Sequence, residues 1–459
     1  MIKESFRKFL EDAIGRENAL VAFSAFEEPA SVAVRYNPFK QADRMEGETV
    51  MWSRHGVLLD ERPVFTLDPD FHAGAYYVQD SSSMFVGDVF RRLLQGYELP
   101  QGRPLRVLDL CAAPGGKTTD LAASLREACG DRFILVANEV MKQRAGVLAS
   151  NVALWGDPNV VVTSDDPKAF ASFTGYFDII LADVPCSGEG MFRKDEQARE
   201  QWSEDNVALC EGRQRRIIAD VWPSLAEGGM LVYSTCTFNR CENDGNVKWI
   251  SDNLGGSPVF VNPESPYEGI IATEYGFSLV PGFVRGEGQY CSAVKKTVAA
   301  SGVYEPKQFR SRPSKDKGTP IPESARSLFS IDVNLRQRGE TIIALPASLV
   351  QDIAFLESSL NVIAAGCAAG TVKGKDFIPD ADLALSIVLE KDAYPRAEVD
   401  SNTALAFLHR DAIRLDDAPK GYVLVTYQGL PLGFVKNLGN RCNNLYPQSR
   451  RIRMNIKQI

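Results

Sequence analysis

Five short apolar segments, rich in β-branched residues, alternate with helical segments through the middle of the chain. They read LRVLDL, RFILVAN, NVVVT, FDIILAD and MLVYSTC, and all lie between residues 105 and 236. The intervening stretches, such as TTDLAASLREAC, have the length and composition of helices. Nearly continuous apolar strands separated by helices are typical of a parallel sheet covered on both faces. The sequence therefore predicts an α/β, Rossmann-like, doubly wound core.

The composition excludes several classes of protein. The chain has 459 residues, 24% of them charged, and no apolar run approaches the roughly 20 residues that a membrane span needs. Its nine cysteines include no C-x-x-C pair, and its three histidines lie far apart in sequence. With no export signal visible at the N-terminus, these features predict a cytoplasmic protein with reduced thiols, no metal centre and no membrane partner.

Changes in sequence texture divide the chain into five parts. An N-terminal α+β domain is expected before the core, and a polar, proline-containing stretch after it is typical of a linker. Alternating strands broken by Gly-Leu-Pro and Gly-Asn turns indicate a small β-rich module at the C-terminus. The predicted boundaries are 1–80 for the N-terminal domain, 81–300 for the core, 301–323 for the linker, 324–390 for a middle α+β region and 391–459 for the C-terminal module.

The segment VLDLCAAPGGKT places a turn of small residues between the first core strand and a helix. Such a turn lets backbone N–H groups and a helix N-terminus approach a ligand at the carboxyl edge of the sheet. A Walker A loop would need glycine where Cys111 stands, and the dinucleotide fingerprint G-x-G-x-x-G is absent. A loop for another adenosine compound and a purely structural turn remain as interpretations.

Acidic residues follow each of the next three strands. Glu139 ends the second strand, Asp165 and Asp166 follow the third, and Asp183 ends the fourth. A carboxylate at the second strand commonly binds a ribose diol, and one at the third could accept the adenine amino group. A ligand with a ribose, an adenine and a positive charge but no phosphate fits this set. The sequence therefore predicts S-adenosylmethionine as the cofactor.

Two cysteines follow core strands in polar, turn-forming sequence. Cys186 follows Asp-Val-Pro at the end of the fourth strand, and Cys236 follows Ser-Thr at the end of the fifth. In a doubly wound sheet both positions face the same crevice. A thiolate is a strong nucleophile. Carbon 5 of a pyrimidine becomes reactive toward a methyl donor only after a nucleophile adds at carbon 6, so the two thiols suggest methylation of that carbon.

Three segments together resemble the RNA cytosine-carbon-5 methyltransferases of the Nop/Sun family. They are VLDLCAAPGGKT, ADVPCSGEGMFRKD and YSTCTFNRCEN. AVRYNPFK and YYVQDSSSM are similar to N-terminal elements of that family, and GFVKNLGNRCNNLYPQSRRIR is similar to the PUA-like C-terminal module of its RsmF-type branch. The resemblance implies methylation of cytosine in RNA, most specifically in small-subunit (16S) ribosomal RNA, through a covalent cysteine–cytosine adduct.

The resemblance also implies a role for each site residue. Cys236 is similar to the nucleophile, Cys186 to the thiol that helps to eliminate the carbon 5 proton, and Asp183 to the residue that holds the target base near the methionine end of the cofactor. Glu139 would bind the ribose of the cofactor and Asp166 its adenine. The other residues expected to line the cofactor form the turn: Cys111, Ala112, Ala113, Pro114, Gly115, Gly116 and Lys117.

Basic residues near the proposed active site and in the last segment are expected to bind RNA phosphates. They are Arg193, Lys194, Lys436, Arg441, Arg450, Arg451 and Arg453. The expected partner is 16S rRNA in the 30S subunit or in an assembly intermediate. Methylation of transfer RNA and a catalytically silent, RNA-binding assembly factor remain as alternatives. FIPDADLALS lacks the histidine associated with this region of the RsmF-type branch, which bears on the choice of substrate.

Overall fold

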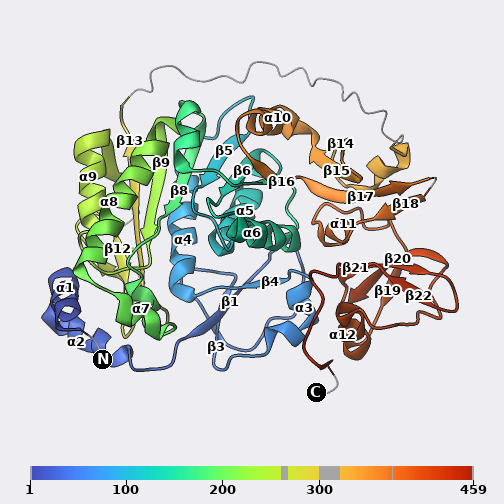
Figure 1. Ribbon diagram of the computed structural model, residues 1–459, viewed down its shortest axis with the longest axis horizontal. Coiled ribbons are helices and arrows are strands. Elements are labelled where there is room, and N and C mark those ends of the chain that lie inside the picture. The colour runs from blue at the N-terminus through green and yellow to red at the C-terminus, as the bar shows by residue number, and fades with distance from the viewer. Residues whose placement is uncertain (1–2, 260–266, 299–320, 375, 457–459) are drawn as a thin grey trace.

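The computed structural model describes the chain apart from residues 1–2, 260–266, 299–320, 375 and 457–459. Figure 1 shows a large central sheet flanked by helices, with smaller sheets below it and to the right in the view. The predicted linker, 301–323, falls almost entirely outside the described residues.

The predicted doubly wound core is confirmed by the central sheet. Its middle strands run parallel in the order β9-β8-β5-β6-β7. The chain thus builds β5 to β7 outward in one direction and then returns to place β8 and β9 on the other side of β5. The bounds are β5 (Leu105–Asp109), β6 (Phe133–Asn138), β7 (Val160–Thr163), β8 (Phe177–Asp183) and β9 (Leu225–Thr235).

Antiparallel strands extend this sheet at both edges. β13 (Gln289–Lys296) pairs with β9 and carries β10 (Gly256–Val259), β12 (Phe277–Leu279) and, beyond β12, β11 (Ile271–Ala272). At the opposite edge, β16 (Val362–Ala365) pairs with β7. β16 comes from the stretch predicted to be a separate middle region, so part of that region completes the core sheet.

Alternate strand residues pack against helices on opposite faces of the sheet. Val107 and Leu135 contact the layer of α4 (Ser81–Gln95), α5 (Gly116–Cys129) and α6 (Lys142–Trp155). Leu108 and Val136 contact the other layer, which contains α8 (Glu204–Val221), α9 (Asp244–Leu254), α10 (Val350–Ser359) and the short helices η2 (Pro167–Ser172) and η4 (Trp222–Ser224). Burial on both faces explains why these strands lack alternating polar residues.

The N-terminal region combines two helices with a small antiparallel sheet. α1 (Glu4–Ile14) buries Phe6, Leu10 and Ile14 along one face. α2 (Arg16–Ala25) follows directly, and the sheet has the order β2-β3-β1-β4. The bounds are β1 (Val32–Tyr36), β2 (Glu48–Thr49), β3 (Gly56–Leu59), β4 (Tyr76–Val78), η1 (Phe65–Leu67) and α3 (Pro69–His72).

Two further sheets complete the molecule. The first contains β14 (Val333–Arg338), β15 (Thr341–Pro346), β17 (Cys367–Lys373) and β18 (Asp376–Pro379), with η5 (Glu323–Leu328), η6 (Ala347–Leu349) and α11 (Ala381–Leu385) beside it. The second contains β19 (Arg396–Glu398), β20 (Gly421–Tyr427), β21 (Leu430–Asn437) and β22 (Cys442–Asn444), with α12 (Ser401–His409). Phe407 and Tyr446 of this last module share an apolar cluster with Tyr36 and Tyr76 of the N-terminal sheet, so the two ends of the chain pack together.

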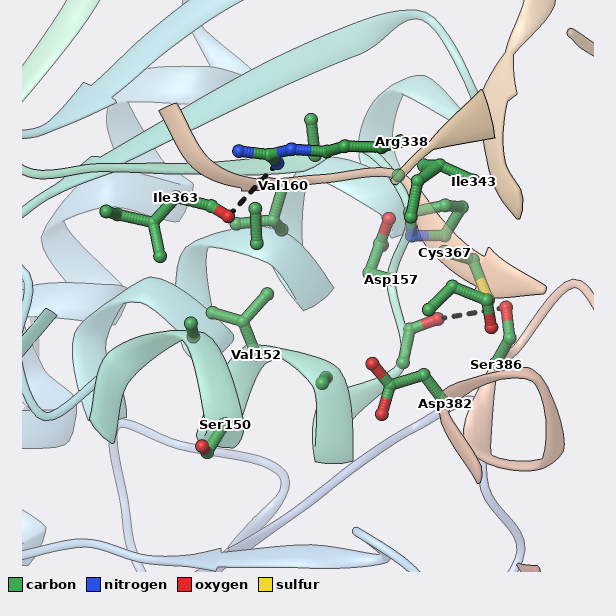
Figure 2. A pocket seen from close by; sticks show the side chains of 18 of the residues that line it. Ser150, Val152, Asp157, Val160, Arg338, Ile343, Ile363, Cys367, Asp382 and Ser386 are labelled. Atoms are coloured by element: carbon green, nitrogen blue, oxygen red, sulfur yellow. Dashed lines mark hydrogen bonds between the residues drawn. The ribbon is translucent and has the colours of Figure 1, made fainter. Parts of the chain in front are cut away.

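A cavity of about 240 Å³ lies where α6 and β7 meet the β14–β18 sheet. In Figure 2, Arg338 reaches across it to the backbone carbonyl of Ile363, at 3.2 Å. Asp382, which also lines this cavity, pairs with Arg450 at 2.7 Å. The charged groups around this cavity are therefore already paired with protein atoms.

Candidate active site

The site lies where the order of the parallel strands reverses. β5 has β6 on one side and β8 on the other, and the chain leaves all three strands at the same edge of the sheet. In open α/β sheets, ligands bind outside the carboxyl ends of the strands at such a point. The glycine turn follows β5, Cys186 follows β8, and Cys236 follows the next strand, β9.

The glycine turn is held by residues of the next strand and helix. The Ala112 N–H donates to the carbonyl of Asn138 at 2.8 Å. Arg144 and Asn151 of α6 donate to the carbonyls of Ala113 and Pro114, each at 2.8 Å. Gly115 has φ +113°, in the left-handed region, and α5 begins at the following residue. These contacts place the N-terminus of α5 at the carboxyl edge, where backbone N–H groups can meet a ligand.

Asp109, the last residue of β5, carries an unsatisfied oxygen beneath this turn. Its Oδ2 accepts a hydrogen bond from Thr118 at 2.7 Å, but its buried Oδ1 has no partner in the part of the chain that the structure describes. Burial raises the pKa of Asp109 to about 7. A buried carboxyl with an unpaired oxygen is costly without a partner, which indicates a polar or cationic ligand at this point.

We expect Asp109→Asn to flatten the pH dependence of stability. Because the pKa of Asp109 is higher in the folded than in the unfolded chain, the free energy of unfolding falls as the pH rises from about 4 to about 7. Asparagine can still accept the Thr118 hydrogen bond but carries no charge. The decrease in the free energy of unfolding between about pH 4 and about pH 7 should be smaller in Asp109→Asn than in the wild type, by up to roughly 4 kcal/mol.

Urea unfolding at several pH values in that range would measure the effect. Asp252→Asn, which changes an exposed carboxylate on α9, is the matched control and should leave the pH dependence as in the wild type. An unchanged slope in Asp109→Asn would contradict a raised pKa for Asp109.

The acids after β6 and β7 also reach this edge, and each already has a contact. Glu139 is buried, accepts from the Met141 N–H at 2.9 Å, and lies 3.2 Å from Arg144. Asp165 accepts from the Asn361 N–H at 2.9 Å, whereas the Asp166 side chain caps η2 by accepting from the Lys168 N–H. The roles predicted for Glu139 and Asp166 toward a cofactor therefore stay predictions.

Asp183 and Lys117 form an ion pair between the glycine turn and the end of β8. Lys117 Nζ lies 2.9 Å from Asp183 Oδ2, and the Ser234 hydroxyl donates to Asp183 Oδ1 at 2.6 Å. Burial acts to lower the pKa of Lys117, but Asp183 and Cys236 raise it, and the net direction is upward. A fixed positive charge thus lies near Cys236.

The two thiols predicted to share a crevice are in direct contact. The Sγ atoms of Cys186 and Cys236 lie 3.1 Å apart. The hydrogen bond to Cys236, together with burial, raises the pKa of Cys186 well above its usual value. Burial and this hydrogen bond thus favour the protonated form of the Cys186 thiol, and the Lys117 ammonium lies near Cys236.

Two buried carboxylates tie together the loops that carry these thiols. Glu189 Oε2 accepts from the N–H groups of Phe238 and Asn239, at 2.7 and 3.1 Å. Glu242 Oε2 accepts from the Ser187 N–H at 3.0 Å, and its Oε1 from the Asn239 amide at 2.7 Å. Each carboxylate belongs to one loop and binds the other. The sequence prediction missed these residues, although two glutamates within six residues of the cysteines are visible in SGEGMF and NRCEN.

The N-terminal helices brace the same two loops through aromatic contacts. Phe192, which follows η3 (Glu189–Met191) in the Cys186 loop, packs on Phe6 with ring centroids 4.9 Å apart. Phe238, in the Cys236 loop, packs on Phe26 at 5.9 Å. The short α7 (Glu196–Gln201) precedes Trp202, which joins the cluster. The N-terminal region thus helps to fix the position of both thiols.

The basic residues predicted to bind RNA differ in their availability. The Arg193 side chain is 7% exposed and forms a bidentate pair with Glu287, both contacts at 2.8 Å, so the geometry gives no support to an RNA contact by this residue. Lys194 is exposed, and its Nζ lies 3.7 Å from Asp80 Oδ1. The others lie on the C-terminal module: Arg441, Arg451 and Arg453 are exposed, Lys436 pairs with Asp376, and Arg450 pairs with Asp382.

The fold and this constellation define a methyltransferase of the Rossmann-like class, and three family comparisons match the sequence. Residues 2–81 match the N-terminal domain of 16S rRNA methyltransferase RsmF, residues 100–268 match the 16S rRNA methyltransferase RsmB/F family, and residues 394–452 match the methyltransferase RsmF PUA domain. The chain belongs to the RsmF-type 16S rRNA methyltransferases, and RNA is the substrate class of this family.

Curated proteins of known name are similar to this chain over most of its length. The ribosomal RNA small subunit methyltransferase F of Enterobacter sp. (strain 638) is 33% identical over 389 residues, which cover 82% of this chain and 77% of the relative. The protein of the same name from Serratia proteamaculans (strain 568) is 32% identical over 421 residues, which cover 87% and 84%.

Solved structures share the fold. A methyltransferase homologue from Pyrococcus horikoshii has a TM-score of 0.52 at 24% identity and covers 64% of this chain and 95% of its own. The NSun6 protein from Pyrococcus horikoshii, solved with SFG, has a TM-score of 0.50 at 18% identity over 64% and 98% of the two chains. Within the described residues, no helix is long and apolar enough to cross a membrane. Nor does that part of the chain contain a group of three or more His, Cys, Asp or Glu that could hold a metal ion.

Proposed function

We propose that the protein methylates carbon 5 of a cytosine in 16S rRNA, with S-adenosylmethionine as methyl donor and through a covalent cysteine–cytosine adduct. The observation that carries this proposal is the pair of thiols, Cys186 and Cys236, 3.1 Å apart at the switch point of a methyltransferase sheet. A nitrogen or oxygen of the substrate can attack the methyl group directly, so its methylation needs no thiol. Carbon 5 of cytosine becomes nucleophilic only after a thiolate has added to carbon 6.

The residues at the carboxyl edge fit S-adenosylmethionine. The unpaired Oδ1 of Asp109 and the carboxylates of Glu139 and Asp183 suit a cationic nucleoside, and the small residues of the glycine turn allow close approach. Residues Cys111 to Lys117 would line this cofactor, Glu139 would bind its ribose and Asp166 its adenine. When bound, it would supply a methyl group carried on a positively charged sulfur.

The two thiols would act in sequence on the flipped cytosine. The Cys236 thiolate adds to carbon 6, and the electron pair displaced from the 5,6 double bond makes carbon 5 nucleophilic. After methylation, the carbon 5 proton must leave, the double bond re-forms and the carbon 6–sulfur bond breaks. Cys186, in contact with Cys236, would assist this elimination. To accept the carbon 5 proton, Cys186 must first lose its own proton to water, and its raised pKa then makes the resulting thiolate a strong base for this step.

Replacing Cys186 with alanine should trap the covalent intermediate. Cys236 would still attack, but release would be slowed, so a protein–RNA adduct resistant to denaturant should accumulate. Incubation of the variant with S-adenosylmethionine and 30S subunits, followed by a denaturing gel, would show it as a slower band. Sequencing the trapped RNA would locate the methylated cytosine.

The wild type and Cys236→Ala are the comparisons for this experiment. Neither should accumulate the adduct, because the wild type releases its product and Cys236→Ala lacks the nucleophile. An adduct in Cys236→Ala but not in Cys186→Ala would reverse the two roles. The absence of both an adduct and methyl transfer, with free RNA and with 30S subunits, would contradict the proposed chemistry.

A further inference from the structure

A second, larger cavity lies between the N-terminal sheet and α6, close to the glycine turn. Its volume is about 610 Å³, and its walls come from residues 62–66, 71–78 and the C-terminal half of α6. This volume is within the range of sites that hold one small molecule or one nucleotide. We refer to it as the Trp155 cavity. No residue assigned to the thiol chemistry lines it.

The walls of the Trp155 cavity are aromatic and rigidly held. Trp155 stacks beneath the guanidinium of Arg35, which lies 4.7 Å from its ring centroid. Tyr76 donates its hydroxyl proton to Asp68 at 2.6 Å. Phe65 and Phe71 complete this part of the wall. Trp155, Tyr76 and Phe65 are buried, whereas Phe71 and Tyr77 are partly exposed, so a planar group would stack on Phe71 and Tyr77, which the buried rings hold in place.

The charge around the cavity favours an anionic ligand. None of the residues that line it is acidic. Arg62 is exposed at its rim, with its guanidinium 5.4 Å from the centroid of Phe65, and no carboxylate of the described chain forms an ion pair with it. This contrasts with the cavity of about 240 Å³ described above, where Arg450 and Asp382 neutralise each other. Arg62 is therefore available to a phosphate.

Two polar side chains in the wall could read the edge of a base. The Asn151 amide nitrogen donates to Pro114 at 2.8 Å and lies 3.4 Å from the Tyr77 hydroxyl oxygen. Across the described residues, neither the hydroxyl proton of Tyr77 nor the side-chain oxygen of Asn151 has a hydrogen-bond partner. The wall thus offers one donor and one acceptor side by side.

The same two residues connect the Trp155 cavity to the candidate active site. Tyr77 lies against Gly116, so closely that a Cβ at this position would stand 3.3 Å from the Tyr77 ring. Asn151 holds the carbonyl of Pro114 in the glycine turn. A group bound in the cavity would therefore be separated from the turn by one layer of side chains, close enough to belong to the same strand of RNA as the target.

We propose that the Trp155 cavity binds one unpaired base of the RNA substrate, near the cytosine to be methylated. The base stacks on the aromatic wall, Tyr77 and Asn151 hydrogen-bond to its edge, and Arg62 contacts the adjoining phosphate. Single-stranded RNA is recognised in this way, by stacking on aromatic side chains and by edge contacts to splayed bases. The inference rests on the RNA substrate of the family and on no step of the two-thiol chemistry.

Binding of a short, fluorescein-labelled single-stranded RNA, measured by fluorescence anisotropy without methyl donor, would test this proposal. Tyr77→Leu keeps apolar bulk but removes the aromatic ring and the hydroxyl, and should weaken binding roughly five- to 100-fold. Arg62→Gln should weaken binding and reduce the slope of log affinity against log salt by about 0.7, the contribution of one phosphate contact in a single strand. RNA carrying 4-thiouridine should photocrosslink to the wall of the cavity.

Two matched variants and one independent measurement make the result decisive. Tyr275→Leu, beside β12, and Arg132→Gln, at the opposite edge of the sheet from the glycine turn, should bind RNA as the wild type does. Thermal unfolding of Tyr77→Leu would show whether this variant keeps its fold. Because Arg62 is exposed, Arg62→Gln tests RNA binding without disturbing the packing of the protein. Wild-type affinity and salt dependence in Arg62→Gln, or crosslinks confined to other surfaces, would overturn the proposal. Because no turnover is measured, a failure of the thiol chemistry would leave this result unaffected.

Discussion

Replacing Cys236 with alanine should reduce methyl transfer to 16S rRNA by roughly 10⁴-fold or more, the scale of loss when a covalent nucleophile is removed. Carbon 5 of cytosine is unreactive until a nucleophile adds to carbon 6, and the neighbouring Cys186 is held as a protonated thiol. Cys186 is therefore poorly suited to replace the lost nucleophile. Transfer of a radioactive methyl group from S-adenosylmethionine to 30S subunits would measure the rate.

Cys241→Ala is the matched control for this prediction. Cys241 lies five residues further along the same loop, but it is exposed and, in the part of the chain that the structure describes, forms no hydrogen bond with either thiol. Its replacement should leave methyl transfer close to the wild-type rate. If Cys236→Ala retained comparable activity, the nucleophile would have to be another group, and the role assigned to the contact between the two thiols would be wrong.

The parallel core could be predicted because its strands are defined by local sequence. Each of the five apolar runs is buried on both faces, and burial of that kind leaves a continuous signal in the residues themselves. The first helix carries a local signal as well, since Phe6, Phe9, Leu10 and Ala13 recur at helical spacing, and Phe6 and Leu10 are buried. Periodicity identifies an element and the faces that it buries.

Periodicity does not identify the partner of an edge strand. The apolar run at Val362–Ala365 indicates a strand, but its pairing with β7 joins residues about two hundred positions apart in the sequence. The prediction therefore placed this run in a separate middle region. Likewise, nothing local to Phe407 or Tyr446 shows that the C-terminal module packs against Tyr36 and Tyr76.

In the candidate site, too, the sequence predicted residues that follow strands but not contacts between distant segments. The sequence placed Glu139, Asp183 and both cysteines at the ends of strands, because parallel strands must bring those ends to one edge. It could not show that Glu287, ninety-four residues away, pairs with Arg193. Nor could it show that Glu189 accepts hydrogen bonds from the Cys236 loop. Contacts between distant segments decide which charged groups remain available to RNA.

Replacing Asp183 with asparagine should lower methyl transfer by roughly 10²–10⁴-fold, the usual range for a residue that acts through proton transfer or hydrogen bonding in the transition state. Its carboxylate joins Lys117 at 2.9 Å and Ser234 at 2.6 Å, and it ends the strand next to the one that leads to Cys236. Asparagine has nearly the same shape and can accept the Ser234 hydrogen bond, but it cannot pair with the charge of Lys117.

This substitution separates an effect on the base from an effect on the thiol. If Asp183 acts on the target base, Asp183→Asn should lose methyl transfer while Cys236 remains reactive, because Lys117, released from its pair, still lies near the sulfur. Alkylation of Cys236 by iodoacetamide, mapped by mass spectrometry, should then proceed at least as fast as in the wild type. Asp165→Asn changes a carboxylate after β7, which β5 and β6 separate from β8, and should change neither measurement by a comparable factor. A parallel loss of alkylation and methyl transfer would show instead that Asp183 acts by setting the position or charge of the nucleophile, and its assignment to the base would be wrong.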